Sequence, residues 1–143
     1  MVIEYKRIFI DTAPIIYLLE KNPTYYERAL EFFQSCFKQK TELITSAITV
    51  TEYCVFPLRN NQNKLIENFD CFLSQADMKV IPIDYVIAKK ASEIRANYIN
   101  FKAMDCLQLA TASLLACDMF LTNDKQLMNY KELIVKTFID EIF

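Results

Sequence analysis

The chain has 143 residues, of which 53% are hydrophobic and 24% are charged, with 16 basic and 18 acidic side chains. It contains no histidine and no glycine. The lack of histidine excludes Ser-His-Asp and Cys-His nucleophile systems and His-based zinc sites. The lack of glycine excludes the glycine-rich loops that bind dinucleotides and nucleoside triphosphates. Carboxylates, thiols, hydroxyls and lysines remain for chemistry, in a chain whose length fits a single domain over 1–143.

The cysteines and the hydropathy pattern bear on the compartment. Five cysteines are present, an odd number, without a C-x-x-C pair. We expect them to be reduced core thiols of a cytoplasmic protein. The longest uncharged apolar run, 106–117, is far shorter than the roughly 18 residues of a membrane span, and no signal-peptide cleavage site follows the first apolar stretch. We therefore expect no membrane association. The cysteines are Cys36, Cys54, Cys71, Cys106 and Cys117.

The first half of the chain alternates short β-rich runs with helical patterns. A strand is predicted over 7–10, and Asp11 and Pro14 then start a helix that ends near Glu20. A helical stripe follows over 25–38, and a second strand over 42–45. Ser46 can cap the next helix, predicted from Ala47 to about Phe56 because Pro57 follows.

The second half repeats this alternation. Apolar spacing predicts a helix over 63–76, a strand over 78–81 and an amphipathic helix from Asp84 to about Tyr98. The stretch 103–116 is almost wholly apolar and is predicted to be a buried helix. A strand over 118–122, a short helix from Asn123 and a last strand over 133–137 complete the chain.

Strands that alternate with helices predict a parallel sheet, because parallel neighbours are joined by helical crossovers. The fold class is therefore α/β, with helices on both faces of the sheet in three layers. Ligands of such sheets bind outside the carboxyl ends of the strands. The residues that directly follow each strand thus matter most for function.

Two aspartates follow predicted strands directly. Asp11 comes after the first strand, and Asp124 follows the strand at 118–122. Each can simply cap the helix that begins there or complement its dipole. Their positions alone do not decide between a capping and a functional role.

Two further acids lie on predicted helices in less ordinary places. Glu52 falls on the stripe Ile48, Glu52 and Val55, which we expect to face the core, although a glutamate at the edge of such a stripe can also reach water. Asp105 is the only charged residue between Lys102 and Asp118. A buried carboxylate needs a cation, a metal ion or a proton, unless Asp105 merely complements the helix dipole.

A parallel sheet would bring Asp11, Glu52, Asp105 and Asp124 to its carboxyl edge. Carboxylates in one pocket repel each other, and a bound cation offsets this repulsion. Oxygen-only ligands suit Mg²⁺ or Mn²⁺, whereas zinc prefers histidine or cysteine. Such an ion is most often used in phosphoryl chemistry.

Four segments resemble, in order, the motifs of PIN-domain ribonucleases, particularly VapC-type toxins of toxin-antitoxin modules. The resemblance spans almost the whole chain. It departs from the family in one respect, because relatives commonly place a glycine before the fourth strand, near Cys117 and Asp118. The segments are IFIDT at 8–12, TVTEY at 49–53, DCLQLATA at 105–112 and FLTND at 120–124.

The resemblance implies an α/β/α sandwich with a parallel sheet of about five strands. It also implies a Mg²⁺- or Mn²⁺-dependent endoribonuclease that a small cognate antitoxin inhibits. By position, Asp11, Glu52, Asp105 and Asp124 match the family's acidic quartet of metal ligands, and Thr122 matches its hydroxyl residue.

The remaining expectations concern substrate and partners. Lys102 and Lys125 flank two of the acids and are candidate contacts to RNA phosphates. The content of 8 tyrosines and 11 phenylalanines suggests an apolar surface groove for an antitoxin helix or for a second copy in a homodimer. Two alternatives are a catalytically inactive PIN-like module that binds RNA or a protein, and a receiver-like phosphoacceptor domain, whose adjacent acids and lysine do not match Glu4 and Lys136.

Overall fold

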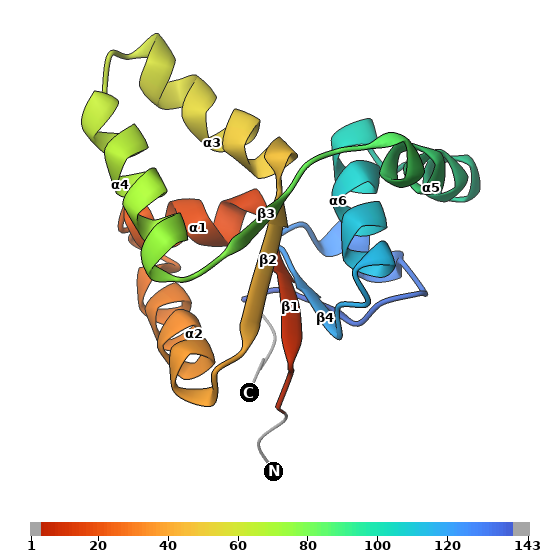
Figure 1. Cartoon of the computed structure of the whole chain (residues 1–143), viewed down its shortest axis with the longest axis horizontal. Coiled ribbons are helices and arrows are strands. Elements are labelled where there is room, and N and C mark those ends of the chain that lie inside the picture. Colours follow the sequence, from red (N-terminus) through yellow and green to blue (C-terminus); the bar gives the residue numbers. More distant parts are fainter. Residues whose placement is uncertain (1–3, 139–143) are drawn as a thin grey trace.

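Residues 4–138, which the computed structural model describes, form a five-stranded sheet with helices on both faces (Figure 1). All neighbouring strands are parallel, in the order β3-β2-β1-β4-β5. The predicted α/β/α sandwich is thereby confirmed. The strands are β1 (Arg7–Ile10), β2 (Glu42–Ser46), β3 (Lys79–Ile81), β4 (Met119–Leu121) and β5 (Val135–Lys136). The helices are α1 (Thr12–Leu19), α2 (Tyr26–Gln39), α3 (Ala47–Arg59), α4 (Asn63–Gln75), α5 (Tyr85–Asn97), α6 (Ala103–Leu114) and the 3₁₀ helix η1 (Lys125–Asn129).

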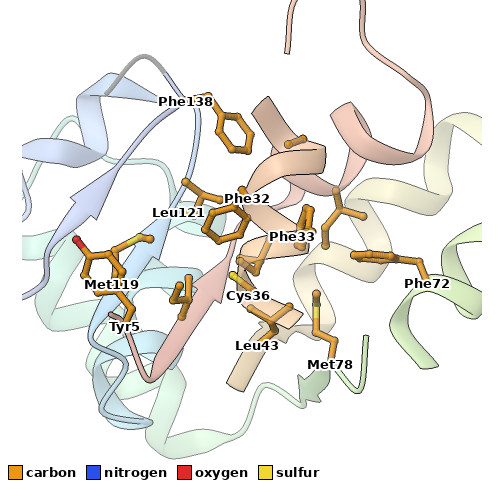
Figure 2. Close-up of a cluster of buried hydrophobic side chains, with 14 of the residues drawn as sticks. Tyr5, Phe32, Phe33, Cys36, Leu43, Phe72, Met78, Met119, Leu121 and Phe138 are labelled. Atoms are coloured by element: carbon orange, nitrogen blue, oxygen red, sulfur yellow. The ribbon is translucent and has the colours of Figure 1, made fainter. Parts of the chain in front are cut away.

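The side chains of the central strands alternate between two hydrophobic layers. Ile8 and Ile10 pack on the side of α1 to α4, whereas Phe9 faces α5 and α6. Figure 2 shows the first layer, in which Phe32 and Phe33 of α2 lie against the sheet. In the second layer the rings of Phe9 and Phe120 stack with centroids 5.1 Å apart. This alternation leaves strands β1 and β4 buried on both faces, as expected for the centre of a parallel sheet.

The predicted end of the third long helix at Phe56 is wrong. Helix α3 continues through the buried Pro57 to Arg59. A proline in the last turn costs only one backbone hydrogen bond, and the end of α3 is closed by two others. The amide of Asn60 donates to the carbonyl of Phe56 at 3.1 Å, and that of Gln62 to the carbonyl of Pro57 at 2.9 Å.

The turn before β4 is made without glycine. Ala116 adopts a left-handed backbone conformation with φ of 55° after the end of α6. The amide of Cys117 donates to the carbonyl of Ala112 at 3.0 Å, which closes the helix in the way that usually requires glycine. The missing glycine therefore leaves the path of the chain into β4 intact.

The cysteines match their predicted environment only in part. All five thiols are free, and Cys36, Cys106 and Cys117 are buried. Cys54 is half-buried and Cys71 is exposed on α4, so these two are not core residues. Helix α4 places Phe69 and Phe72 in the core, which turns Cys71 toward solvent because it lies between them. Among the described residues, no helix is long and apolar enough to span a membrane.

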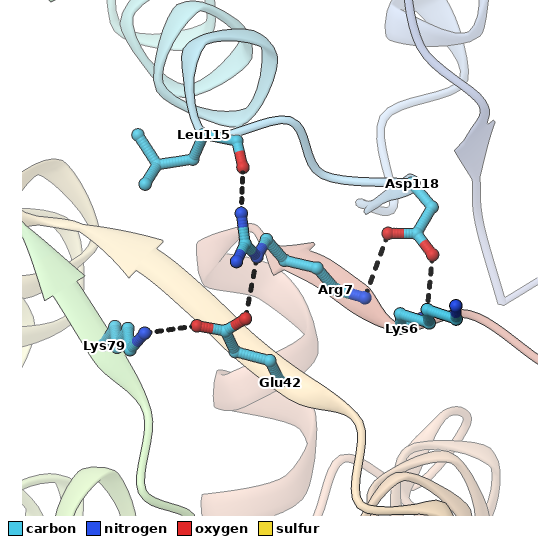
Figure 3. A network of polar contacts seen from close by, with 6 residues as sticks. All are labelled: Lys6, Arg7, Glu42, Lys79, Leu115 and Asp118. Atoms are coloured by element: carbon cyan, nitrogen blue, oxygen red, sulfur yellow. Dashed lines mark hydrogen bonds and ion pairs between the residues drawn. The ribbon is translucent and has the colours of Figure 1, made fainter.

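The amino edge of the sheet, where the strands begin, carries a set of paired charges (Figure 3). Glu42 at the start of β2 forms ion pairs with Arg7, at 2.7 Å, and with Lys79. The carboxylate of Asp118 accepts the backbone amides of Lys6 and Arg7, at 2.6 and 3.0 Å. Both acids thus have partners at the edge opposite to the predicted site.

Candidate functional site

Asp11 is held rigidly where β1 ends and α1 begins. It is the N-cap of α1, and its Oδ1 accepts the backbone amide of Thr12 at 2.9 Å. Its Oδ2 accepts the hydroxyl of Thr122 at 2.8 Å. Burial raises the pKa of Asp11; the hydrogen bonds from Thr122 and Thr12 oppose this rise, and the charge of Glu52 adds to it. The capping role considered from the sequence is confirmed, and only 9% of the residue stays exposed.

Thr122 links Asp11 to Asp124. The backbone amide of Asp124 donates to the Thr122 hydroxyl oxygen at 3.1 Å, and this hydroxyl in turn donates to Asp11. Asp124 is exposed, and its Oδ1 caps η1 by accepting the amide of Gln126 at 3.0 Å. Asp124 is therefore also a helix cap, and its Oδ2 has no hydrogen-bond donor among the described residues.

Glu52 lies in a different setting from the one predicted. The buried face of α3 consists of Thr49, Tyr53 and Pro57, so the stripe of Ile48, Glu52 and Val55 lies beside it and Glu52 is exposed. The prediction that the stripe of Glu52 faces the core was wrong, because the buried stripe is offset from it by one position along the helix. Glu52 still reaches the site, because its Oε1 accepts the hydroxyl of Thr12 at 2.8 Å.

Asp105, like Asp11, has a carboxyl group with a raised pKa. It is half-buried in the first turn of α6. Burial raises its pKa from 3.8 to about 6, and the charges of Asp11, Asp124 and Glu52 add to this rise, while Lys102 opposes it. The structure therefore brings all four predicted acids within electrostatic reach of one another. Repulsion between like charges is typical of functional sites.

The positive charges near these acids are few. Lys102 is the residue before α6 and Lys125 begins η1, and both side chains are exposed. Neither forms an ion pair within residues 4–138, and none of the four acids has a lysine or arginine partner within this range. The two lysines thus stand beside Asp105 and Asp124 without neutralising them by direct contact.

A buried polar network around Gln108 contacts Asp11 of the site. Sequence reasoning missed this network. Gln108 is 1% exposed, and its amide nitrogen donates to Thr49 Oγ1 at 2.8 Å and to Asp11 Oδ1 at 3.4 Å. Its amide oxygen accepts the hydroxyl of Ser46. Thr49 also lies within hydrogen-bond distance of the Thr45 and Thr12 hydroxyls, at 2.8 and 3.2 Å. The only signal in the sequence was a glutamine on the apolar stripe of α6.

The donor chemistry of the site fits a hard divalent cation. All four acids and Thr122 offer oxygen atoms, which Mg²⁺ and Mn²⁺ prefer. The charges of Asp11, Asp124 and Glu52 also add to the raised pKa of Asp105, a repulsion that a cation would relieve. In the arrangement seen, however, no three acidic or thiol side chains within 4–138 are placed to hold one metal ion. Hydroxyl donors from Thr122 and Thr12 engage Asp11 and Glu52 instead. The ligand roles of the four acids therefore stay predictions.

Solved structures of similar fold belong to toxin-antitoxin systems. VapBC-1 from nontypeable Haemophilus influenzae has a TM-score of 0.74 at 17% identity, covering 94% of this chain and 99% of that chain. VapBC2 from Rickettsia felis, solved with a promoter DNA fragment, has a TM-score of 0.73 at 18% identity, covering 92% and 98%. The Mycobacterium tuberculosis toxin VapC20, described as cleaving the sarcin-ricin loop, has a TM-score of 0.64 at 16% identity, covering 89% and 98%.

The family itself is established by sequence. No curated protein matches the chain as a relative. The family model of the PIN domain, however, matches residues 8–133, a range that includes Asp11, Glu52, Asp105 and Asp124. With this match over most of its length, and with the parallel sheet and acidic edge described above, the chain belongs to the PIN-domain family.

Proposed function

We propose that this protein is a Mg²⁺- or Mn²⁺-dependent endoribonuclease and the toxin of a toxin-antitoxin pair. The observation that carries the proposal is the gathering of Asp11, Glu52, Asp105 and Asp124 at the carboxyl edge of the sheet, without a lysine or arginine partner among residues 4–138. Membership of the PIN-domain family supports a nuclease. RNA as the substrate is supported by the similar fold of VapC20, described as a sarcin-ricin loop cleaving toxin.

In this proposal the four acids would hold the cation, directly or through water. A bound Mg²⁺ or Mn²⁺ would supply an activated water and neutralise charge on the scissile phosphodiester. Thr122 and Gln108 orient Asp11 through their hydrogen bonds. Lys102 and Lys125 attract the RNA backbone toward the acids, which offsets the repulsion between carboxylates and phosphates.

The proposed partners are an antitoxin and a second copy of the chain, in the cytoplasm. Toxin-antitoxin complexes are among the structures of similar fold. Helix α3 exposes Val55, Phe56 and Leu58, with 36%, 55% and 61% of each residue accessible. Exposed apolar side chains on one helix support the proposal that this helix contacts another protein. Light scattering that gives a strict monomer, together with no partner recovered from the native host, would contradict this part.

The decisive experiment is an RNA cleavage assay with purified protein. We expect cleavage of cellular RNA with Mg²⁺ or Mn²⁺ and none with chelator. Asp105→Asn should be inactive, because it removes a ligand charge and keeps the side-chain shape. Lys38→Gln, which changes an exposed charge on α2, is the matched control. In cells, expression without a partner should arrest growth, and Asp105→Asn should relieve the arrest; equal toxicity of both proteins would contradict the toxin role.

A second candidate is an inactive PIN-like module that binds RNA or a partner protein. It is favoured by the present roles of the acids, since Asp11 and Asp124 cap helices and Glu52 is bound by Thr12. This candidate predicts binding of Mg²⁺ or of a partner, with no cleavage product under any ion. The cleavage assay therefore distinguishes the two.

A further inference from the structure

A pocket of about 250 Å³ is formed by residues that lie close in the chain to Asp105 and Asp124. Its wall is formed by the loop between α5 and α6, residues 97–101, and by two residues of η1, Gln126 and Asn129. Pockets for whole small molecules begin near about 300 Å³, so this one suits a single ring system. None of the residues that form it belongs to the acidic quartet.

The apolar part of the pocket is aromatic. The ring of Tyr98 stacks on that of Phe101, with centroids 4.7 Å apart and planes 10° apart, and Tyr130 packs edge-on against Tyr98 at 5.4 Å. The Tyr98 hydroxyl is fixed by the backbone amide of Lys131 at 3.1 Å. Tyr98 is half-buried, lines the pocket and is held by these contacts, so the exposed part of its ring offers a rigid aromatic surface. Stacking on such surfaces is the common way in which proteins bind unpaired bases.

The polar part of the pocket consists of side-chain amides. Asn97, Asn100 and Gln126 line it, and their side chains form no hydrogen bond with any residue within 4–138. Asn129 donates to the carbonyl of Gln126 at 3.0 Å, which leaves its amide oxygen free. Gln126 and Asn129 are three residues apart and thus share one face of the 3₁₀ helix. Amides both donate and accept, as the edges of nucleobases do.

The rim of the pocket adds an apolar cover. Ile99 lines the pocket and is 85% exposed, an unusual environment for a large aliphatic side chain. A planar ring that entered the pocket would bury part of this side chain as well as the surface of Tyr98. Apolar burial and stacking would then act together on the same ligand.

The pocket and the acids share the same two chain segments. Phe101 precedes Asp105 by four residues, and Gln126 follows Asp124 by two. The chain between the two residues of each pair can therefore span at most about two nucleotide lengths. Asp105 and Asp124 are themselves electrostatically coupled. Lys102 and Lys125 stand in these segments between pocket and acids. An RNA strand that passed the acids would therefore carry a neighbouring base to the pocket.

We propose that this pocket, between the loop at 97–101 and η1, binds one unpaired nucleobase of the RNA next to the scissile phosphate. The inference rests on the proposed ribonuclease function and adds a specificity site to it. The base packs on the exposed part of the Tyr98 ring, the free amides bind its hydrogen-bonding edge, and Ile99 covers it. The protein then prefers RNA in which that position is single-stranded, and it discriminates among the four bases there.

The test measures RNA binding and RNA cleavage separately. Binding is measured by fluorescence anisotropy with short single-stranded oligonucleotides of A, C, G and U, with chelator present and in the Asp105→Asn background. The pocket variants are Asn100→Ala/Gln126→Ala, which removes two exposed amides, and Tyr98→Ala, which removes the stacking surface. The control is Gln62→Ala/Asn63→Ala, which removes two exposed amides at the start of α4, in the opposite helical layer. Cleavage is measured with the same substitutions in the wild-type background.

The proposal predicts that the amide double variant weakens the binding of the preferred oligonucleotide by about fivefold or more, and that its preference among the bases declines. The control variant should bind like its parent. If wild type cleaves RNA while the pocket variants bind, cleave and discriminate like the control, the pocket proposal is overturned and the nuclease remains. If neither binding nor cleavage of RNA is found, both proposals fail. If Tyr98→Ala does not fold, the amide double variant alone decides.

Discussion

The two edges of the sheet hold acidic residues in opposite electrostatic conditions. At the amino edge, Glu42 is bound by Arg7 and Lys79, and these contacts lower its pKa (Figure 3). At the carboxyl edge, burial and neighbouring carboxylates raise the pKa of Asp105 to about 6, and burial raises that of Asp11. The same fold therefore contains acids whose charge is compensated and acids whose charge is not.

This difference distinguishes acids with structural partners from the acids of the proposed site. An ion pair near the surface adds little stability, but each of its charges is compensated by an opposite charge. Clustered acids without cations repel each other and oppose folding. Proteins retain such repulsion where their function depends on the clustered charges. The comparison favours a structural role for Glu42 and supports the chemical role proposed for Asp105, and substitutions at each edge test both roles.

The largest expected effect is on catalysis at the carboxyl edge. Asp11→Asn should lower RNA cleavage by a hundredfold or more, because a metal ligand supplies several kcal/mol of transition-state stabilisation, and about 1.4 kcal/mol corresponds to tenfold. Glu42→Gln should cleave at the wild-type rate. Single-turnover cleavage with saturating Mn²⁺ measures both. Equal losses in the two variants would show that folding, and not the site, limits activity.

The network under the site should contribute more stability than an isolated buried hydroxyl. Gln108→Leu removes the acceptor of the Ser46 hydroxyl and one of the hydrogen-bond donors to Thr49, and should lower the free energy of unfolding by about 1–3 kcal/mol. Thr111→Val is the matched control, because among the described residues the buried Thr111 hydroxyl on the same helix binds the carbonyl of Leu107 alone. Urea denaturation measures both variants. A loss in Gln108→Leu no larger than in Thr111→Val would contradict a supporting role of the network.

The acidic cluster should weaken the metal-free fold in a pH-dependent way. The folded protein binds the Asp105 proton more tightly than the unfolded chain does, so stability falls as pH rises from about 4 to about 6. In chelator at pH 7, Asp105→Asn should therefore melt about 3 °C higher than wild type, which corresponds to about 1 kcal/mol. At pH 4 the two proteins should melt together. A variant that melts lower at pH 7 would indicate that Asp105 is an ordinary stabilising cap.

The smallest effect, of opposite sign, is expected at the amino edge. Glu42→Gln removes the partner of Arg7 and Lys79 and should cost about 1 kcal/mol or less at pH 7. Because the pKa of Glu42 is lowered, this stability is present at neutral pH and is lost as pH falls through that pKa. Thermal scans from pH 3 to 7 follow the difference between the two proteins. A difference that grows in acid would contradict the account of the paired edge.

The fold could be predicted from the sequence because the hydrophobic periodicity changes clearly between strand and helix segments. Runs such as 7–10 and 119–121 are short and β-rich, and the intervening stripes repeat as helices do, so strand order in the chain and the parallel class follow. The end of α3 could not be predicted, since only neighbouring structure decides whether a helix tolerates Pro57 in its last turn. The left-handed conformation of Ala116 could not be predicted either, because this conformation favours glycine and the sequence has alanine at this position.

The acids were predictable as a set, but their surroundings were not. Asp11 and Asp124 follow strands, and the family motifs point to all four positions. The hydrogen bonds from Thr122 and Thr12 to the acids depend on how separate elements meet in space. The role of Gln108 also needs the structure, because a single buried amide has no sequence signature until its partners are known.

A metal titration of stability tests the central claim most directly, that the carboxyl-edge acids form a cation site. Melting temperatures of wild type, Glu42→Gln and Asp105→Asn are measured in chelator and with increasing Mn²⁺. Binding to the folded state alone stabilises by about 2.7 kcal/mol at a hundredfold excess over Kd. We predict a saturable rise in melting temperature that is equal in wild type and Glu42→Gln and much smaller in Asp105→Asn. Equal responses in all three proteins, or no response in any, would contradict the account.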